Sequence, residues 1–394
     1  MDDGRRRLVL LGGGHSHLAV VAAAGQWTAA AEVTLVSPDV RTAYSGMVPG
    51  VIAGHYAIDD CLIDVARLAA RSKVRFLQAA ATGLDPLRRI VRLDDGGTLD
   101  YDLLSIDVGA TPRIPDAVAG AVLHGQCGGL TLAPCKPFPL LIERLDRFFA
   151  SLPGQPGPIE ACVVGAGLAG IEVALALAFR LRHRPSTRIR LLSGEARLLP
   201  AAAHGIGSAL ERACHEAGVE VVPDCRIATV EPPGTLVAAD GRRFPARLAL
   251  FATGAAAPAW LAHSGLMLDP RGFIAVEPTL ASVSHPEVFA AGDCASVLQH
   301  PRPKAGVYAV RQGLPLADNL RRALAGERPV PFSPQREALA LAALGPRSAI
   351  AIRNGWALGG PAGRRWLGHG LSGRLSRQLW RWKDRIDQAF VGRY

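Results

Sequence analysis

The stretch VLLGGGHSH, residues 9–17, has a counterpart in CVVGAGLAG, residues 162–170, and this pair decides the fold. In each stretch a short apolar run leads into closely spaced glycines. Glycines at a strand-to-helix turn let the backbone turn tightly and approach a pyrophosphate, whose charge then rests on the N-terminus of the following helix. The segments ATG at 252–254 and VFAAGDC at 288–294 follow later in the chain. Together the four segments predict two dinucleotide sites, one for a bound flavin and one for a nicotinamide.

The composition is that of a soluble enzyme with two or three domains. The chain has 394 residues, of which 49% are hydrophobic, and this is enough to bury more than one core. The seven cysteines form no CxxC pair and are odd in number, which favours a reducing compartment, so we expect a cytoplasmic location. No apolar stretch reaches the roughly 20 residues that span a bilayer, and we expect no membrane-crossing segment.

Hydrophobic periodicity predicts an α/β fold with two Rossmann-like dinucleotide-binding domains. The Pro- and Gly-rich stretch 151–158 is the clearest linker, and a second strand-helix-strand unit begins after it. Since 251–254 is expected to return the chain to the first domain, we expect the second domain to be inserted in the first. The expected parts are an FAD-binding domain at 1–120 and 256–330, a connecting segment at 121–157, an NAD(P)H-binding domain at 158–255, and a C-terminal α-containing region with an amphipathic helix at 331–394.

The first glycine loop departs from the GxGxxG pattern. Gly12 and Gly14 stand at its first two positions, but His17 replaces the third glycine, which normally permits close packing of helix and strand. His17 therefore indicates either a wider crossing or a functional side chain at the phosphate. His15 and His17 share a spacing compatible with a metal, yet no carboxylate or cysteine lies nearby in sequence, so we expect no metal site.

The second glycine loop fills every position of GxGxxG with Gly165, Gly167 and Gly170, and this predicts the nicotinamide nucleotide site. Glu172 lies two residues further into the expected helix. We expect its carboxylate to face the nicotinamide or a proton-transfer path.

The carboxylate that commonly binds a ribose at the end of the second strand is missing from both units. Ser37 stands there in the first unit, with Asp39 two residues later, and either residue is a candidate for the flavin's adenosine. Ser193 stands there in the second unit, flanked by Arg190 and Arg197. These arginines are compatible with a 2′-phosphate, so NADH and NADPH both stay open.

The chain resembles the two-dinucleotide-binding-domain flavoproteins of the pyridine nucleotide-disulfide oxidoreductase superfamily. The resemblance is carried by the glycine segments and by LGGGHSHLAV from Leu11, YSGMVPGVIAGHY from Tyr44, CKPF from Cys135 and WRWKDRIDQAF from Trp380. Within the superfamily the chain is similar to type II NADH dehydrogenases and sulfide:quinone reductases. It is closer still to the oxidoreductase module associated with selenophosphate synthetase, which is thereby a candidate partner.

The resemblance implies noncovalent FAD in the first domain and NADH or NADPH as substrate. It places Gly12 and Gly14 at the FAD pyrophosphate, Asp293 at the ribityl chain, and the SGMVPG loop, which contains Met47 and Pro49, along the isoalloxazine. The expected cofactor-binding residues are Gly12, Gly13, Gly14, His15, His17, Ser37, Asp39, Met47, Pro49, Gly109, Gly165, Gly167, Gly170, Gly254, Gly292, Asp293 and Gln312. The catalytic candidates are Glu172, Lys136 and Cys135.

Several residues differ from the motifs of the similar families, and these differences limit the redox reactions that we expect. Disulfide reductases carry a CxxxxC pair that the stretch 41–54 lacks, so a dithiol relay there is excluded. Cys127 and Cys135 are open either to a redox role beside the flavin or to simple burial. Lys136 is a candidate for lowering a thiol pKa or polarising the flavin. In the helix after VFAAGDC, Val307 and Arg311 stand at two of the glutamine positions that border the quinone in type II NADH dehydrogenases, and only Gln312 and Gly313 of that motif remain.

The tail accounts for most of the net positive charge. The chain has a formal net charge of +10, and residues 347–394 hold ten Lys and Arg against two Asp. Apolar residues recur there at three- and four-residue steps, as expected for one face of a helix. This face includes Leu371, Leu375, Leu379, Trp382, Ile386 and Phe390. The helix is open to packing on its own domain or on a homodimer partner, and to lying on an anionic membrane surface; no nucleic-acid motif accompanies the charge.

The sequence therefore predicts an oxidoreductase that passes hydride from NAD(P)H to FAD and then electrons to an acceptor, with a quinone at the inner face of the cytoplasmic membrane as first choice. A reductase for a sulfur or selenium species and a non-catalytic flavin-binding redox partner are the alternatives.

Overall fold

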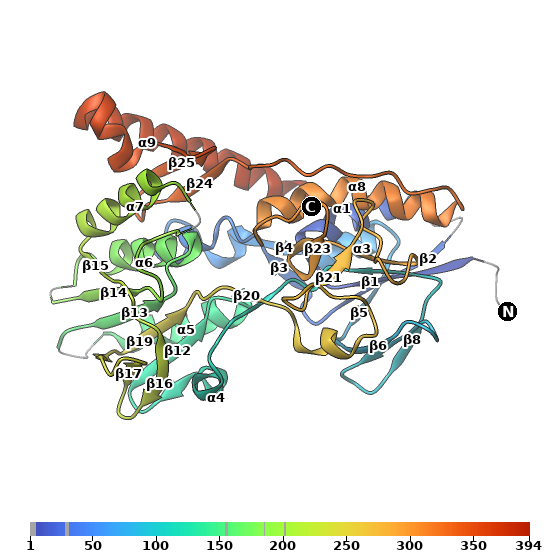
Figure 1. Ribbon diagram of the computed structural model, residues 1–394, viewed down its shortest axis with the longest axis horizontal. Coiled ribbons are helices and arrows are strands. Elements are labelled where there is room, and N and C mark those ends of the chain that lie inside the picture. Colours follow the sequence, from blue (N-terminus) through green and yellow to red (C-terminus); the bar gives the residue numbers. More distant parts are fainter. Residues whose placement is uncertain (1–4, 28–30, 154–156, 185, 201) are drawn as a thin grey trace.

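Two mainly parallel β-sheets lie side by side along the long axis of the molecule, each with helices packed on it (Figure 1). The computed structural model describes residues 5–27, 31–153, 157–184, 186–200 and 202–394, and it describes side chains within these ranges except at 362–369 and 371. The sequence predicted this mixed α/β architecture, and the structure confirms it.

The first sheet has five parallel strands in the order β22-β9-β1-β2-β5. Its strands are β1 (Arg6–Leu11), β2 (Ala31–Ser37), β5 (Arg75–Gln78), β9 (Leu103–Ile106) and β22 (Val288–Ala290). Because β22 pairs with β9, a strand from late in the chain completes a sheet that begins at the N-terminus. The second domain is thus inserted in the first, as expected.

Helices α1 (His15–Ala24), α3 (Val65–Arg71) and α8 (Gly306–Leu324) belong to this first domain. α1 and α8 pack on each other, and the Ser16 hydroxyl donates a hydrogen bond to the Ala309 carbonyl at 2.8 Å. Smaller elements surround the domain. They are β3 (Arg41–Ala43), α2 (Val48–Ala53), β4 (Leu62–Asp64), β6 (Ala81–Asp85), β7 (Ile90–Leu93), β8 (Thr98–Asp100), β21 (Ile274–Val276) and β23 (Ala295–Val297).

The second sheet has six strands in the order β11-β12-β19-β13-β14-β15, all parallel except β11. They are β11 (Gln126–Cys127), β12 (Leu130–Pro134), β13 (Glu160–Val164), β14 (Arg188–Leu192), β15 (Val219–Val222) and β19 (Leu248–Phe251). The associated elements are α4 (Asp116–His124), α5 (Phe138–Ser151), α6 (Leu168–Leu181), α7 (His204–Glu216), β16 (Ile227–Glu231), β17 (Thr235–Ala238) and β18 (Arg243–Pro245).

The segment 121–157 differs from the expectation of a plain connection. It supplies β11, β12 and α5 to the second domain, because Leu130–Pro134 pairs in parallel with β19. The chain returns to the first domain after β19, which is a central strand of the second sheet. The chain passes between the two domains twice, and these two segments pair with each other as β10 (Thr111–Pro112) and β20 (Ala255–Ala256).

The C-terminal region is a three-stranded antiparallel sheet followed by a long helix. The sheet is made of β24 (Ala340–Ala343), β25 (Ala349–Arg353) and β26 (Trp356–Leu358), and the helix is α9 (Gly360–Arg393). In Figure 1, α9 starts above α7 of the second domain and ends near α8 of the first. The helix therefore spans both dinucleotide-binding domains.

No helix in the part of the chain that the structure describes is both long enough and apolar enough to cross a bilayer.

Candidate functional site

The first glycine loop follows β1 and opens α1. Gly12 has a φ of +95°, and its amide donates to the Val36 carbonyl at 2.8 Å, so the loop is tied to the neighbouring strand. A Cβ at Gly12 would overlap the Asp107 backbone carbonyl. Gly14 is the N-cap residue of α1 with an extended backbone, and a Cβ at Gly13 would press on the Ser37 hydroxyl. Only glycine fits this close approach of the loop to its neighbours.

His17 lies in the core of the first domain and makes two hydrogen bonds within the protein. Its Nδ1 donates to the Gly12 carbonyl at 2.7 Å, and its Nε2 accepts from the Ser105 hydroxyl at 2.8 Å. Burial lowers the pKa of His17 to about 4, so the ring is neutral at physiological pH. Since both ring nitrogens are engaged inside the fold, the ring bridges the loop and β9 where a third glycine would give direct contact. Of the two interpretations left open by the sequence, this geometry favours the wider crossing over a side chain at the phosphate.

Asp107 was not singled out from the sequence, yet its carboxylate lies at the N-terminus of α1. Its Oδ2 accepts from the backbone amides of Ser16 at 2.8 Å and His17 at 3.1 Å. Burial raises the pKa of Asp107 to about 7, with the nearby Asp293 adding to the increase. A signal existed in the sequence: the second domain has ATG at 252–254, whereas the first has Asp107, Val108 and Gly109 after the corresponding strand.

The second glycine loop has the same backbone path and a more open helix terminus. Gly165 has a φ of +110°, and its amide donates to the Leu192 carbonyl at 2.9 Å. Gly167 is the N-cap residue of α6, and a Cβ there would meet nothing within 4 Å. A Cβ at Gly170 would overlap the Gly165 carbonyl, so the third glycine is needed for the helix to pack against the strand. This loop leaves the space beside the N-terminus of α6 free for a pyrophosphate.

The two strand ends that were expected to lack a ribose-binding acid share one local structure. The Ser37 hydroxyl donates to the Asp39 carbonyl at 3.0 Å, and the Ser193 hydroxyl donates to the Glu195 carbonyl at 2.7 Å. Arg190 is already paired within the protein, with Glu160 at 3.0 Å and with a second glutamate on β15.

Arg197, the other arginine considered for a 2′-phosphate, donates to the Pro200 carbonyl at 2.6 Å and contacts the His204 ring. Neither arginine is therefore arranged around the end of β14 as a phosphate clamp.

The turn after β22 brings together residues that are far apart in sequence. Lys136 pairs with Asp293 at 2.8 Å, and the Gly292 amide donates to the Gln312 side-chain oxygen at 2.7 Å. Gly292 has a φ of +68°. Lys136, Asp293 and Gln312 were each predicted as site residues, and the structure joins them at one turn.

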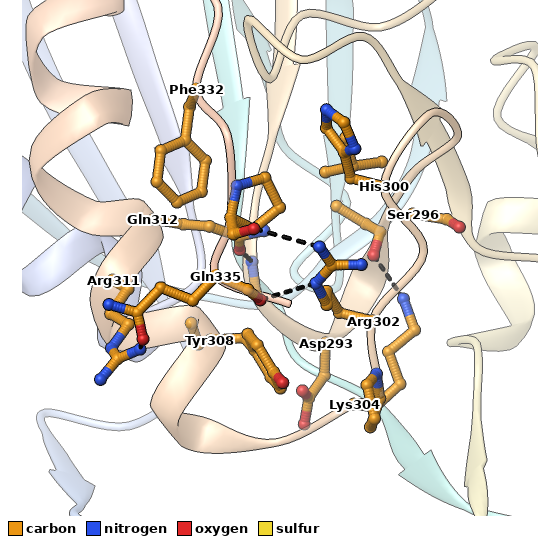
Figure 2. A pocket seen from close by; sticks show the side chains of 16 residues that line it. Asp293, Ser296, His300, Arg302, Lys304, Tyr308, Arg311, Gln312, Phe332 and Gln335 are labelled. Atoms are coloured by element: carbon orange, nitrogen blue, oxygen red, sulfur yellow. Dashed lines mark hydrogen bonds between the residues drawn. The ribbon is translucent and has the colours of Figure 1, made fainter. Parts of the chain in front are cut away.

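A small pocket of about 30 Å³ lies beside this turn. Figure 2 shows Tyr308, Arg311 and Gln312 on one side of it and Ser296, His300 and Lys304 on the other. Arg302 donates to the Gln335 and Pro334 carbonyls and so ties the segment after α8 to the pocket wall.

The SGMVPG loop is covered by the end of α9. Met47 and Pro49 are buried, and the Lys383 ammonium donates both to the Gly46 carbonyl and to the Asp387 carboxylate. The Phe390 ring lies 4.5 Å from the Tyr44 ring and 5.9 Å from the His15 ring, measured between centroids. The last turns of α9 therefore close the first glycine loop and the SGMVPG loop together.

The catalytic candidates Glu172 and Cys135 have different surroundings. Burial raises the pKa of Glu172 to about 7, and its carboxylate accepts from the Ala343 amide at 2.8 Å, with Lys383 opposing the increase. Burial raises the pKa of Cys135 to about 12. A redox-active cysteine needs a lowered pKa, so this position favours burial over the redox role.

Two further predicted glycines lie in turns at the ends of strands. Gly109 has a φ of +72° and follows β9. The Gly254 carbonyl accepts from the Arg113 amide at 2.8 Å, next to the β10 and β20 crossing.

The residues present fit two dinucleotides. Each glycine loop has, beside it, a buried polar atom with no hydrogen-bond partner among the described residues: His15 Nε2 at the first loop and the Thr253 hydroxyl at the second. Such atoms favour a ligand that completes their hydrogen bonds. At the first loop the Asp107 carboxylate already accepts two of the amides of the helix terminus.

Comparisons with known proteins agree with this geometry. Residues 6–313 match the family described as pyridine nucleotide-disulphide oxidoreductase. The type II NADH:quinone oxidoreductase of Staphylococcus epidermidis is 24% identical over 343 residues, which cover 83% of this chain and 85% of that protein.

Solved structures show the same fold. NDH2 from Plasmodium falciparum in complex with NADH aligns with a TM-score of 0.77 at 14% identity, covering 98% of this chain and 97% of that chain. The sulfide:quinone oxidoreductase from Aquifex aeolicus aligns with a TM-score of 0.74 at 16% identity, covering 98% and 90%.

Proposed function

The chain belongs to the pyridine nucleotide-disulphide oxidoreductase family, and from this premise we propose that it is an FAD-dependent enzyme that carries electrons from NADH to a quinone. One observation carries the proposal: two glycine loops of the same backbone path open helices on the two sheets of one chain. Two such loops are what an enzyme needs to hold two dinucleotides at once.

The chemistry of bound FAD in such an enzyme is hydride acceptance from a nicotinamide and donation of two electrons to an acceptor. The protein binds and orients the two nucleotides and supplies groups that take up or release protons. The loop at Gly165 and Gly167 holds the pyrophosphate of NADH at the N-terminus of α6. Asp293, which pairs with Lys136, would hold the ribityl chain of FAD. Glu172 is poised to hold or release a proton near neutral pH.

NADH is our choice over NADPH. A 2′-phosphate needs free cationic side chains at the end of β14, and Arg190 is already paired with two glutamates. Arg197 contacts Pro200 and His204 instead. The relative in Staphylococcus epidermidis bears a name that specifies NADH.

A quinone is our choice of acceptor because two of the compared proteins are named for quinone reduction. The exposed side chains Trp382 and Ile386 on α9, next to the exposed Arg381 and Arg385, suit contact with an anionic membrane surface. We place the enzyme at the inner face of the cytoplasmic membrane on this basis. Pairing with a second copy and association with selenophosphate synthetase stay predictions of the sequence.

Anaerobic stopped-flow measurements test the proposal. The flavin absorbance is expected to bleach on mixing with NADH, more slowly with NADPH, and to return on mixing with menadione or a short-chain ubiquinone. Polysulfide and selenite are the matched alternative acceptors. Return of the absorbance with polysulfide or selenite but with neither quinone would replace the quinone by a sulfur or selenium species, and a flavin that NADH leaves oxidised would refute the enzyme.

A further inference from the structure

The two halves of this chain offer a comparison of equivalent positions. Asp107 follows β9, and its amide donates to the Leu11 carbonyl at 2.8 Å; Ala252 follows β19, and its amide donates to the Val164 carbonyl at 2.8 Å. Each of these carbonyl acceptors directly precedes the first glycine of a loop. Asp107 and Ala252 therefore occupy the same place relative to their glycine loops.

Asp107 and Ala252 differ in how much space they leave at the N-termini of α1 and α6. A Cβ at Gly14, the N-cap of α1, would overlap the Asp107 carboxyl group, whereas a Cβ at Gly167, the N-cap of α6, would meet nothing within 4 Å. Gly292 is also packed against the Asp107 carboxylate. One side chain thus fills, in the first domain, the space that the second domain keeps open.

The Asp107 carboxylate also uses the donors that attract a phosphate to such a helix. It accepts from the amides of Ser16 and His17, the second and third residues of α1. A helix N-terminus stabilises one negative group through its free amides and its dipole. A carboxylate and a pyrophosphate that share this terminus repel each other, and the repulsion is strong in a buried site.

We propose that Asp107 acts as a built-in competitor for the pyrophosphate of the flavin, so that the first domain binds FAD well only when the Asp107 carboxyl is protonated or displaced. This inference rests on the proposed function, because it takes FAD as the ligand of the first domain. It makes Asp107 the residue that sets flavin affinity and its dependence on pH.

The charged and titratable groups around Asp107 agree with a proton on this carboxyl near neutral pH. Burial raises its pKa to about 7, and Asp293 on the neighbouring turn adds to the increase. On α1, burial lowers the pKa of His15 and of His17 to about 4, so neither ring supplies a compensating charge. Burial raises the pKa of the adjacent Cys294 thiol, which stays neutral. Lys136 is paired with Asp293.

The dissociation constant of FAD from the full-length protein, titrated from about pH 6 to about pH 9, tests the proposal. For the wild type we expect a constant value at the acid end and then a rise of up to about tenfold per pH unit as the carboxyl ionises. Asp107→Asn keeps the size and one acceptor but cannot ionise. It is expected to bind FAD with a flat pH profile and at least about tenfold more tightly than the wild type near pH 9.

A reciprocal pair of variants in the second domain gives a matched control. Ala252→Asp introduces the competitor at the open terminus, while Ala252→Asn introduces a neutral group of the same size. The dissociation constant of NADH is expected to be at least about tenfold higher for Ala252→Asp than for Ala252→Asn near pH 9, and the two are expected to converge toward acid pH. FAD occupancy is expected to stay unchanged in both variants.

Different failures have different meanings. A wild-type FAD affinity that is independent of pH and equal to that of Asp107→Asn would overturn the inference and leave Asp107 as a structural cap of α1. The same conclusion would follow if Asp107→Asn bound FAD more weakly than the wild type. If Asp107→Asn does not fold, the inference is tested by the pH dependence of FAD binding to the wild type and by NADH binding to the two Ala252 variants. If no form of the protein binds FAD at any pH, the proposed function fails instead, and the Ala252 pair, titrated with NADH, still shows whether a carboxylate at this place excludes a dinucleotide.

Discussion

Replacing His17 by alanine is expected to cost a large part of the stability of the first domain. The buried imidazole satisfies the Gly12 carbonyl and the Ser105 hydroxyl at 2.7 and 2.8 Å. Leaving a buried polar group without its partner costs about 1–3 kcal/mol, and the space left by the ring adds a cavity term. We therefore expect a loss of about 3–5 kcal/mol, against a total of about 5–15 kcal/mol for a typical domain.

The stability that His17 contributes is also expected to depend on pH. Burial lowers the pKa of His17 in the folded state to about 4, against about 6.5 for an unfolded histidine. The unfolded chain therefore binds the proton first, and the stability that the neutral ring contributes is complete above about pH 6.5 and is lost as pH falls toward about 4. The difference corresponds to about 3 kcal/mol. His15 has the same direction of shift, so the contribution of His17 is the difference between wild type and variant.

Urea unfolding of the flavin-free protein at about pH 8 and about pH 5 measures both effects. Ser105→Ala is the matched control, because it removes one of the two hydrogen bonds and keeps the ring; its expected cost is about 1 kcal/mol. A loss below about 1 kcal/mol for His17→Ala, or an unchanged difference between the two pH values, would refute the bridging role of the ring.

Three other outcomes are expected. Gly167→Val is expected to keep FAD but to abolish its reduction by NADH, since the side chain fills the space at the N-terminus of α6; stopped-flow reduction measures this, and normal kinetics would show that the nucleotide binds elsewhere. Lys383→Met is expected to destabilise the protein by about 3–5 kcal/mol and to loosen FAD, because it leaves the buried Asp387 carboxylate unpaired; thermal unfolding and flavin release measure this, and Arg381→Met is the exposed control. Trp382→Ser combined with Ile386→Ser is expected to reduce sedimentation with anionic vesicles while leaving unfolding unchanged, and equal sedimentation of both proteins would remove the membrane contact.

The glycine loops and the presence of two dinucleotide-binding domains could be predicted from local sequence. Runs of apolar residues before Gly12 and Gly165 specify buried strands, and the backbone conformations at these glycines, with φ of +95° and +110°, are ones that other residues rarely adopt. Even the insertion followed from the order of motifs along the chain. Because each of these features depends on a few neighbouring residues, it can be recognised in a short segment of the sequence.

The chemistry around the loops could not be predicted in this way, because it depends on contacts between distant segments. Asp107 reaches α1 only because β9 pairs with β1, some 90 residues away in sequence. Lys136 meets Asp293 across 157 residues. Strand β12 belongs to the second sheet because it pairs with β19, although its local sequence does not say which sheet it joins. The sequence named Lys136 and Asp293 separately and missed Asp107.

Packing of helix α9 within the protein and contact of the same helix with a membrane surface do not exclude each other. A long helix has more than one face, and the apolar positions from Leu375 to Phe390 spread over a wide arc. The structure buries one edge of that arc, with Leu379 and Phe390 each 8% exposed, and it leaves Trp382 and Ile386 42% and 44% exposed on the other. Leu371 lies outside the residues whose side chains are described.

The buried edge of α9 carries Lys383 and Asp387 onto the SGMVPG loop, and this contact fixes the helix relative to the first domain. A helix anchored in this way presents its opposite edge in a constant orientation. If Trp382 and Ile386 rest on a membrane, as we propose, the same helix both closes the flavin site and sets how that site faces the bilayer. Loss of the buried contact is then expected to disturb flavin binding and vesicle binding together, whereas loss of the exposed side chains is expected to disturb vesicle binding alone.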